Sequence, residues 1–379
     1  MKQRLDSLDI LRGFDMFFIT GGNTLVVGLA AVLGFFPEIA KVQMDHVVWE
    51  GITHHDTIFP LFIFLAGVSW PFSYAAQVAK KASAWAIHRK IFMRMLTLFL
   101  IGLSFGGLPY FKPNFRIMHV LAFIGFSWGW AALLYIHLKS TCNRVIAALI
   151  ILVGYAALLN FVPSPDASAE ALAGPIGVYA KEANIIPWLD AKFYGNHLYM
   201  KIGKGFLFEP ESIFMTIQGA ALAMLGMLGG TWLRREDRTP SQKALGLFLA
   251  AVVALVLTLG ARFGLGIQFV KNLWTTSFVL AMASYSFFML ALFYWLVDVR
   301  GWSGWGVAFR CIGRNSILVY MFNLIHITSP VQKWLFKGCL RTDIGITSEW
   351  HTLIAGLTYF LTAWAIFYYL DKKQVYLKA

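Results

Sequence analysis

The chain has 379 residues, of which 58% are hydrophobic and only 13% are charged. Soluble domains carry about 25% charged residues, so this composition excludes an ordinary soluble protein and predicts an all-α, polytopic membrane protein. The formal net charge of +13 raises the question of nucleic-acid binding. The basic residues are scattered between apolar stretches, however, so we interpret them as topology signals and expect no nucleic-acid partner.

About ten stretches of the chain are long and apolar enough to cross a membrane, which takes roughly 20 residues each. We expect a single transmembrane domain over residues 1–379, with spans near 9–34, 57–79, 91–109, 117–137, 145–163, 212–233, 244–264, 274–298, 309–329 and 352–370. An even number of spans places both termini on one side. Most of the 32 Lys and Arg residues fall on that side, and basic loops stay in the cytosol. Both termini are therefore predicted to be cytosolic.

The first predicted span carries polar residues that membrane helices rarely keep. Arg12 and Asp15 are three residues apart, so they share a helix face and are expected to pair. Arg12 has two interpretations, a side chain that snorkels to the membrane surface or part of an anion site that faces the cytosol. Asn23 follows Gly21 and Gly22 deeper in the span, where a buried Asn most often joins two helices.

Between the first and second spans, the segment 45–60 concentrates His, Asp and Glu residues with Trp49. Ionisable groups at a membrane domain are costly and usually functional, so this segment is the predicted site, on the side away from the cytosol. His46, His54, His55 and Asp56 are metal-ligand types. Adjacent His54 and His55 would project about 100° apart on a helix, and none of the usual zinc spacings occurs, so we expect no metal.

Residues 164–211 form the longest polar connection of the chain. Loops of this length are either disordered or functional, and disordered segments contain few aromatic residues. Trp188, Phe193 and Tyr194 therefore favour an ordered, lid-like loop. On the same side, Arg116 has two interpretations, a contact to lipid headgroups or a group that holds an anionic or hydroxylated ligand.

Two classes of function fit these features. In a transporter, Pro60, Pro71 and Gly21-Gly22 would break helices around a midplane site, but this leaves the one-sided cluster of His and Asp unexplained. In a transmembrane group transfer, a histidine removes a proton from an acceptor, and cytosolic arginines hold an anionic carrier. Acetyl-CoA is a carrier of this shape, because its phosphates attract guanidinium groups.

Several blocks of the sequence, in order from residue 4 to about residue 320, resemble the heparan-α-glucosaminide N-acetyltransferase family. The resemblance is carried by Arg4-Leu-Asp-Ser-Leu-Asp9-Ile-Leu-Arg12-Gly13, His46-Val-Val-Trp49-Glu-Gly51-Ile-Thr53-His-His-Asp56-Thr-Ile-Phe-Pro60, Arg116-Ile-Met-His-Val-Leu, Pro210-Glu211 with Thr216, Lys271-Asn272-Leu-Trp274, Val297-Asp298-Val-Arg300-Gly301 and Arg314-Asn315-Ser316-Ile-Leu-Val-Tyr320. The length is similar to that of the bacterial branch, which is associated with N-acetylglucosamine utilisation.

The resemblance implies an enzyme of the bacterial inner membrane that moves acetyl from cytosolic acetyl-CoA to the amine of glucosamine, or of a glucosamine-containing sugar, on the other side. It identifies His46, Asn23 and Asp56 as catalytic residues. His46 would act as general base, Asn23 would donate to the oxyanion, and Asp56 would orient the imidazole. A covalent route through acetylated His46 is the alternative. The sequence departs from the family pattern at His54-His55 and at Asn323.

Binding residues follow from the two ends of the predicted domain. The donor is expected to contact Arg12, Arg310, Arg314, Asn315 and Ser316. The acceptor is expected to contact Trp49, Arg116, Glu211, Asn272 and Trp274. An amino-sugar permease, and an O-acetyltransferase that acts on a polysaccharide or lipid hydroxyl, remain alternatives. Gly-rich spans and exposed Phe residues would permit a homodimer.

Overall fold

The computed structural model of the chain describes residues 5–111, 114–202, 206–341 and 345–377. Lys2, Arg4 and Lys378, which belong to the basic residues on the predicted cytosolic side, lie outside these ranges. The described helices and strands are α1 (Asp6–Phe17), α2 (Asn23–Leu33), α3 (Pro37–Gln43), α4 (Ile58–Ala79), α5 (Ala84–Phe105), α6 (Val120–His137), α7 (Thr141–Phe161), α8 (Ala169–Ala173), α9 (Ile185–Tyr194), β1 (Met200–Ile202), β2 (Phe206–Phe208), α10 (Thr216–Leu233), α11 (Pro240–Leu259), α12 (Thr276–Tyr294), α13 (Val307–Arg314), α14 (Ser316–Leu324), α15 (Thr328–Leu335) and α16 (Ser348–Lys372).

Within the described residues, seven helices are long and apolar enough to cross a membrane. They cover Asp6–Leu33, His54–Ala79, Val120–His137, Thr141–Phe161, Pro240–Gly264, Thr276–Val299 and Ser348–Lys372. The other three predicted spans also fall on helices. α5 carries three basic residues in its first half, α10 is Gly-rich, and the span expected at 309–329 is broken at Asn315 into α13 and α14. Seven of the ten predicted spans meet this measure, and the count of about ten stays a prediction.

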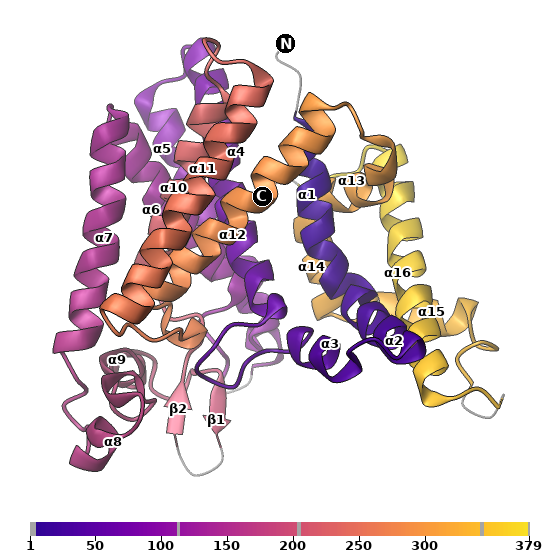
Figure 1. Cartoon of the computed structure of the whole chain (residues 1–379), viewed down its shortest axis with the longest axis horizontal. Helices are drawn as coiled ribbons and strands as arrows, with labels where there is room; N and C mark the ends of the chain where they lie inside the picture. Colours follow the sequence, from indigo (N-terminus) through magenta and orange to yellow (C-terminus); the bar gives the residue numbers. More distant parts are fainter. Residues whose placement is uncertain (1–4, 112–113, 203–205, 342–344, 378–379) are drawn as a thin grey trace.

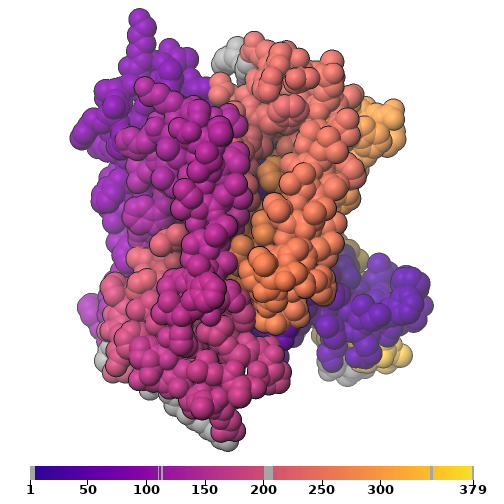
Figure 2. Space-filling model, turned by 60° about the vertical axis from the view of Figure 1, so that its left-hand side comes forward, coloured from indigo at the N-terminus to yellow at the C-terminus, as the bar shows by residue number. Residues whose placement is uncertain are grey.

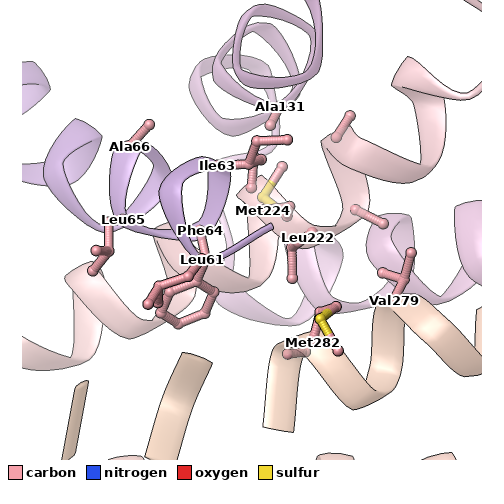
Figure 3. Close-up of a cluster of buried hydrophobic side chains, with 14 of the residues drawn as sticks. Leu61, Ile63, Phe64, Leu65, Ala66, Ala131, Leu222, Met224, Val279 and Met282 are labelled. Carbon is pink, nitrogen blue, oxygen red and sulfur yellow. The ribbon is translucent and has the colours of Figure 1, made fainter. Parts of the chain in front are cut away.

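The helices form two groups that stand side by side (Figure 1). In the larger group, α4, α6, α10 and α12 enclose the main core, which includes Leu61, Phe64, Ala131, Leu222 and Met282 (Figure 3). Helix α10 approaches α4 closely because of its glycines. A Cβ atom added at Gly226 would lie 2.2 Å from the carbonyl oxygen of Phe64. Small residues of this kind let membrane helices pack backbone to backbone.

The smaller group contains α1, α2, α13, α14 and α16 and has its own core, which includes Met16, Phe18, Ile312, Val319 and Phe367. Helix α1 also contacts the larger group, since the rings of Phe14 and Phe293 of α12 have centroids 5.3 Å apart. The boundary between the two groups therefore runs along α1 and α4, and the candidate site lies on this boundary.

The molecule has two ends that matter for function. The end that holds the start of α1 and the turn between α4 and α5 is called the terminal face. The opposite end, which holds α3, α9 and the β1–β2 hairpin, is called the hairpin face (Figure 1). The connection 164–211 covers the hairpin face of the larger group (Figure 2).

The predicted lid-like connection is folded into α8, α9 and the antiparallel pair β1–β2, in which Met200 pairs with Phe208. The hairpin is an addition to the expected all-α fold. Trp49 joins this connection to the segment that carries His46, because its indole Nε1 donates to the carbonyl oxygen of Tyr179 at 2.8 Å. The described part of the connection is therefore packed against the predicted site.

Candidate active site

A break in the first membrane-crossing helix positions Asn23. Between α1 and α2, Thr20 and Gly21 leave helical geometry, and Gly21 has a φ of 97°, which favours glycine. A side chain at Gly21 would also meet the backbone of α16, since its Cβ would lie 2.9 Å from the carbonyl oxygen of Gly356. The chain then resumes helical geometry, with Asn23 as the first residue of α2.

Asp56 is the centre of the polar cluster. It lies in a short 3₁₀ turn before α4, and its side chain forms a capping box with Thr53. The carboxylate is fully buried. Its Oδ2 accepts from the backbone N–H groups of Thr53 at 3.2 Å and Val47 at 3.4 Å, and its Oδ1 accepts from Lys271 Nζ at 2.8 Å. A buried carboxylate needs such partners, and these also fix its direction.

His46 is held by this carboxylate. Its Nδ1 lies 2.7 Å from Asp56 Oδ1, and its side chain remains about half exposed at 53%. Because a carboxylate only accepts hydrogen bonds, Nδ1 is the protonated nitrogen of the neutral ring, and Nε2 keeps its lone pair. Lys271 Nζ lies 3.0 Å from the same Nδ1; with Nδ1 protonated these are two neighbouring donors, and both donate to Asp56 Oδ1. The arrangement leaves Nε2 of His46 as an available base.

A second imidazole lies beside the first. The rings of His46 and His55 have centroids 4.3 Å apart. Asn23 Nδ2 lies 2.7 Å from His55 Nδ1 and 3.2 Å from the carbonyl oxygen of Met44. Both acceptors face the amide nitrogen, so Nδ1 of His55 accepts and its Nε2 carries the proton. His55 therefore presents a donor where His46 presents a base.

The contacts of Asn23 indicate a role beside the predicted one, which stays a prediction. Its two amide hydrogens are engaged by His55 and Met44, and its Oδ1 is buried without a hydrogen-bond partner among the described residues. This amide oxygen can accept a hydrogen bond but cannot donate one to an oxyanion. Asn23 is thus placed to set the tautomer of His55.

A cavity of about 240 Å³ opens beside the two histidines, between the two groups of helices. We call it the hairpin-side cavity. Its polar wall contains His46, His55, Glu211 and Lys271. Its apolar wall reaches into the membrane-crossing helices and contains Met16, Ile19, Ile58, Phe59, Phe62, Val120, Leu121, Ile124, Ile317 and Tyr320. A substrate that enters at the histidines would therefore have an apolar passage beneath it.

Arg116 lies in a cluster of opposite charges at the edge of this cavity. It donates to Glu209 and Glu211, and its guanidinium lies 4.2 Å from the centroid of the Tyr199 ring. Burial, reinforced by the adjacent Glu211, raises the pKa of Glu209 to about 7, although its bonds to Arg116 act in the opposite direction. The two glutamates raise the pKa of Arg116 further above its ordinary value, against the effect of burial. One arginine thus balances two carboxylates.

The remaining residues predicted to bind the acceptor lie in different surroundings. Trp49 is buried between the connection 164–211 and the His46 segment. Trp274 is also buried, and its ring packs against Phe59 and Phe123. Asn272 lies half-buried in the 3₁₀ turn that carries Lys271. Of the five predicted residues, only Glu211 lines the hairpin-side cavity.

The residues predicted to bind the donor lie near the terminal face. Arg314 pairs with Asp371 at 3.2 Å and with Asp9 at 3.6 Å, and Arg310 pairs with Asp6 at 3.4 Å. Asn315 Nδ2 donates to the carbonyl oxygen of Val375 at 3.0 Å. Ser316 is the first residue of α14 and is buried. These contacts join α1, α13 and α16 to one another.

Arg12 differs from the expectation in its partner. It pairs with Asp9 at 3.5 Å and donates to Ser69 of α4, whereas the sequence predicted a pair with Asp15. Asp9 and Asp15 are both three residues from Arg12, so spacing alone does not choose between them. Arg12 also donates to the carbonyl oxygen of Leu65 at 3.3 Å, so its guanidinium is directed toward α4.

Two residues that lie beside His46, namely His55 and Lys271, were not predicted as catalytic or binding residues. From the sequence, His55 was only a metal-ligand type next to His54. Lys271 lies directly before the predicted Asn272, at the same turn. Its role required the fold, because 215 residues separate it from Asp56. Among the described residues, no group of three or more His, Cys, Asp and Glu side chains is placed to hold a metal.

Fold and site together define a class: a multi-pass helical membrane protein with a buried carboxylate–histidine pair at the mouth of a cavity inside the membrane domain. No family model matches the chain. It is 28% identical to mouse heparan-alpha-glucosaminide N-acetyltransferase over 342 residues, which cover 78% of this chain and 51% of the relative. It is 27% identical to the human protein of the same name over 386 residues, with 88% and 57% covered.

These similarities confirm the resemblance that the motifs indicated, so the chain is a relative of heparan-alpha-glucosaminide N-acetyltransferase. The chain spans about half the length of the curated relatives it matches.

Proposed function

We propose that the protein is a transmembrane acetyltransferase that moves acetyl from acetyl-CoA, supplied at the terminal face, to the amine of glucosamine or a glucosamine-containing sugar at the hairpin face. The observation that carries this proposal is the His46–Asp56 pair, which leaves a base exposed in a cavity whose apolar wall extends into the membrane domain. The names of the two relatives supply the reaction class. The proposed location is the bacterial inner membrane, with cytosolic termini.

In the proposed reaction, the amine nitrogen of the sugar attacks the carbonyl carbon of the thioester. His46 Nε2 takes a proton from the amine, and Asp56 stabilises the imidazolium through Nδ1. The carbon–sulfur bond then breaks, the N-acetyl product forms, and CoA leaves as the thiol after it receives the proton. Lys271 neutralises Asp56 in the resting state, so the cluster carries no net charge before reaction.

His55 is the proposed oxyanion donor. Its Nε2 carries a hydrogen because Asn23 occupies Nδ1, and its ring lines the same cavity as His46. A donor directed at the developing negative charge stabilises the tetrahedral intermediate. In this proposal Asn23 does not contact the substrate but holds His55 in the tautomer that donates from Nε2.

The proposal is tested with the purified full chain in nanodiscs, acetyl-CoA and a panel of amino sugars and their N-acetylated or hydroxyl analogues. The readouts are released CoA and the mass of the product. We expect CoA release that depends on a free amine and a product heavier by one acetyl group. Release with hydroxyl acceptors alone would identify an O-acetyltransferase. Uptake of unmodified glucosamine into vesicles without acetyl-CoA would identify a permease.

The same assay separates direct transfer from a covalent route. Protein that has been incubated with acetyl-CoA alone is digested and analysed for an acetyl group on His46. Because direct transfer needs both substrates in one complex, we expect unmodified His46 and no burst of CoA release without acceptor. A stoichiometric burst with acetylated His46 would establish the covalent route instead.

A further inference from the structure

A second cavity lies on the terminal side of the same helices. It has a volume of about 490 Å³, and its wall includes Ser69, Trp70, Ser73, Lys90, Arg94 and Trp128. We call it the terminal-side cavity. These residues come from α4, α5 and α6. None of the described residues that line it is acidic, so the cavity wall holds two cations, Lys90 and Arg94, and no carboxylate.

The polar groups of this cavity are mainly donors. Arg94 Nε, Trp70 Nε1 and Trp128 Nε1 are buried, and none has a hydrogen-bond partner among the described residues. The Arg94 guanidinium lies 4.3 Å from the centroid of the Trp128 ring, and Lys90 Nζ donates to Ser73 at 3.4 Å. A buried donor that has no acceptor destabilises the folded protein. A ligand rich in acceptor oxygens would satisfy all three.

The two cavities are aligned along the same helix faces. Phe62 lines the hairpin-side cavity, and Ser69, seven residues on in α4, lines the terminal-side cavity. On α6, Ile124 lines the hairpin-side cavity, and Trp128, four residues on, lines the terminal-side cavity. Residues seven or four apart share a helix face. The cavities therefore follow one another within one or two helical turns.

Arg12 lies between residues that line the two cavities. It is one turn from Met16, which lines the hairpin-side cavity, and it donates to Ser69, which lines the other. From Ser69 back to Asp56 the chain is thirteen residues long, or about 20 Å at the rise of an α-helix. A phosphopantetheine arm is long and thin enough for such a separation, with phosphates at one end and a thioester at the other.

We propose that the terminal-side cavity binds the phosphate-bearing end of the acyl-CoA donor, with Arg94 and Lys90 as phosphate-binding residues. Trp70, Trp128 and Arg12 face the acceptor oxygens of the arm as it passes toward His46. This inference rests on the proposed function for the identity of the ligand, whereas the cavity and its unpaired donors are independent of it. It moves the donor site from the ion-paired Arg310 and Arg314 to a different group of helices.

The test compares Arg94→Gln and Lys90→Gln with Arg89→Gln, a matched control on the same helix whose side chain packs over Trp85 outside the cavity. CoA binding is measured by calorimetry on the full chain in nanodiscs of neutral phosphatidylcholine. Each variant in the cavity should weaken CoA binding about tenfold or more, as expected for a lost charged hydrogen bond. Arg89→Gln should match the wild type. Lys90 is exposed, so its variant remains informative if Arg94→Gln fails to fold.

Kinetics with two acetyl donors show which part of the donor molecule the cavity binds. The KM for acetyl-CoA should rise in both cavity variants, while the KM for S-acetylpantetheine, which lacks the phosphates, should not change. Unchanged CoA binding in both folded variants, or equal losses with both thioesters, would overturn the proposal. The proposal would also be overturned if the wild type bound phosphatidylglycerol headgroups in this cavity and CoA did not displace them. A further outcome is that the wild type binds CoA and transfers no acetyl group while the cavity variants lose CoA binding. That result would support the site and reject the proposed function.

Discussion

The two cavities hold their polar groups in opposite ways. At the hairpin face, Asp56, His46, Lys271, His55 and Asn23 hold one another in a network of short contacts. In the terminal-side cavity, three buried donors have no acceptor among the described residues. A paired network fixes geometry and tautomers before a substrate arrives, which suits chemistry. Unpaired donors instead leave their hydrogen bonds to a ligand. This difference supports the proposals that catalysis takes place at one end and that the donor binds at the other.

The largest expected effect comes from removing the base. His46→Ala should lower kcat by about 10²- to 10⁴-fold, the usual contribution of a positioned general base. CoA binding should persist, because the donor cavity lies on other residues. The measurement pairs steady-state kinetics with calorimetry, and His351→Ala, a histidine outside the cavity, is the matched control. Activity that survives in His46→Ala would break the assignment of chemistry to the hairpin face.

The charged cluster beside the hairpin-side cavity should be important for stability. Arg116→Ala leaves Glu209 and Glu211 buried without their cation, and breaking a buried ion pair in this way typically costs about 3–5 kcal/mol. Thermal unfolding in nanodiscs measures the loss. Arg262→Ala, which removes a more exposed pair with Glu50, should cost less than about 1 kcal/mol. Similar losses in the two variants would show that burial does not set the strength of the cluster.

The two histidines should differ in what their removal changes. His55→Ala should lower kcat by about 10²- to 10³-fold, as for the loss of one oxyanion donor, with little change in KM. Asn23→Ala should have a smaller effect that disappears in the His55→Ala background, because Asn23 acts through His55. His54→Ala is the adjacent control. Additive effects of the Asn23 and His55 variants would separate the two residues and contradict the tautomer argument.

Glu209 should give stability a dependence on pH. Its folded pKa, raised by burial to about 7, lies above its unfolded value of 4.5. The folded protein therefore holds this proton more tightly, so the stabilisation is complete below pH 4.5 and is lost as pH rises through 7. Unfolding followed between pH 4.5 and 8 should show a fall on the order of 1–3 kcal/mol from this group. Glu209→Gln should flatten the profile, and an unchanged slope in that variant would exclude Glu209 as its source.

The smallest expected effect is that of Arg314→Gln near the terminal face, and it compares two candidate sites for the donor. Arg314 is partly exposed and is held by Asp371 and Asp9, so Arg314→Gln should lower stability by about 1 kcal/mol. The sequence alone predicted that Arg314 binds the donor. If the ion pairs describe its main role, the KM for acetyl-CoA should rise less in Arg314→Gln than in Arg94→Gln. The reverse order would return the donor site to α13.

The sequence predicted features that depend on composition and local spacing. The long apolar helices follow from hydropathy, since a membrane span is a property of one continuous stretch. His46 and Asp56 are ten residues apart in one short segment, so their proximity could also be anticipated. The family resemblance added residue roles that spacing alone could not supply.

Features that depend on packing were missed. The break at Asn315 lies inside an apolar stretch, so hydropathy did not reveal it. Trp274 lies three residues after Lys271, yet its ring packs against Phe123 in the core. The amide hydrogens of Asn23 are engaged by His55 and by Met44, a backbone group 21 residues away. Arg94 looked like one more basic residue near a membrane surface, and only the structure shows that its Nε is buried and unpaired.

The most direct test of the account is the sidedness of the reaction. Acetyl-CoA is sealed inside proteoliposomes that contain the wild-type chain, and glucosamine is supplied only outside. The account predicts N-acetylglucosamine outside and free CoA inside, with neither formed by His46→Ala vesicles. Product that forms only when both substrates are on the same side would contradict a passage from the terminal face to His46.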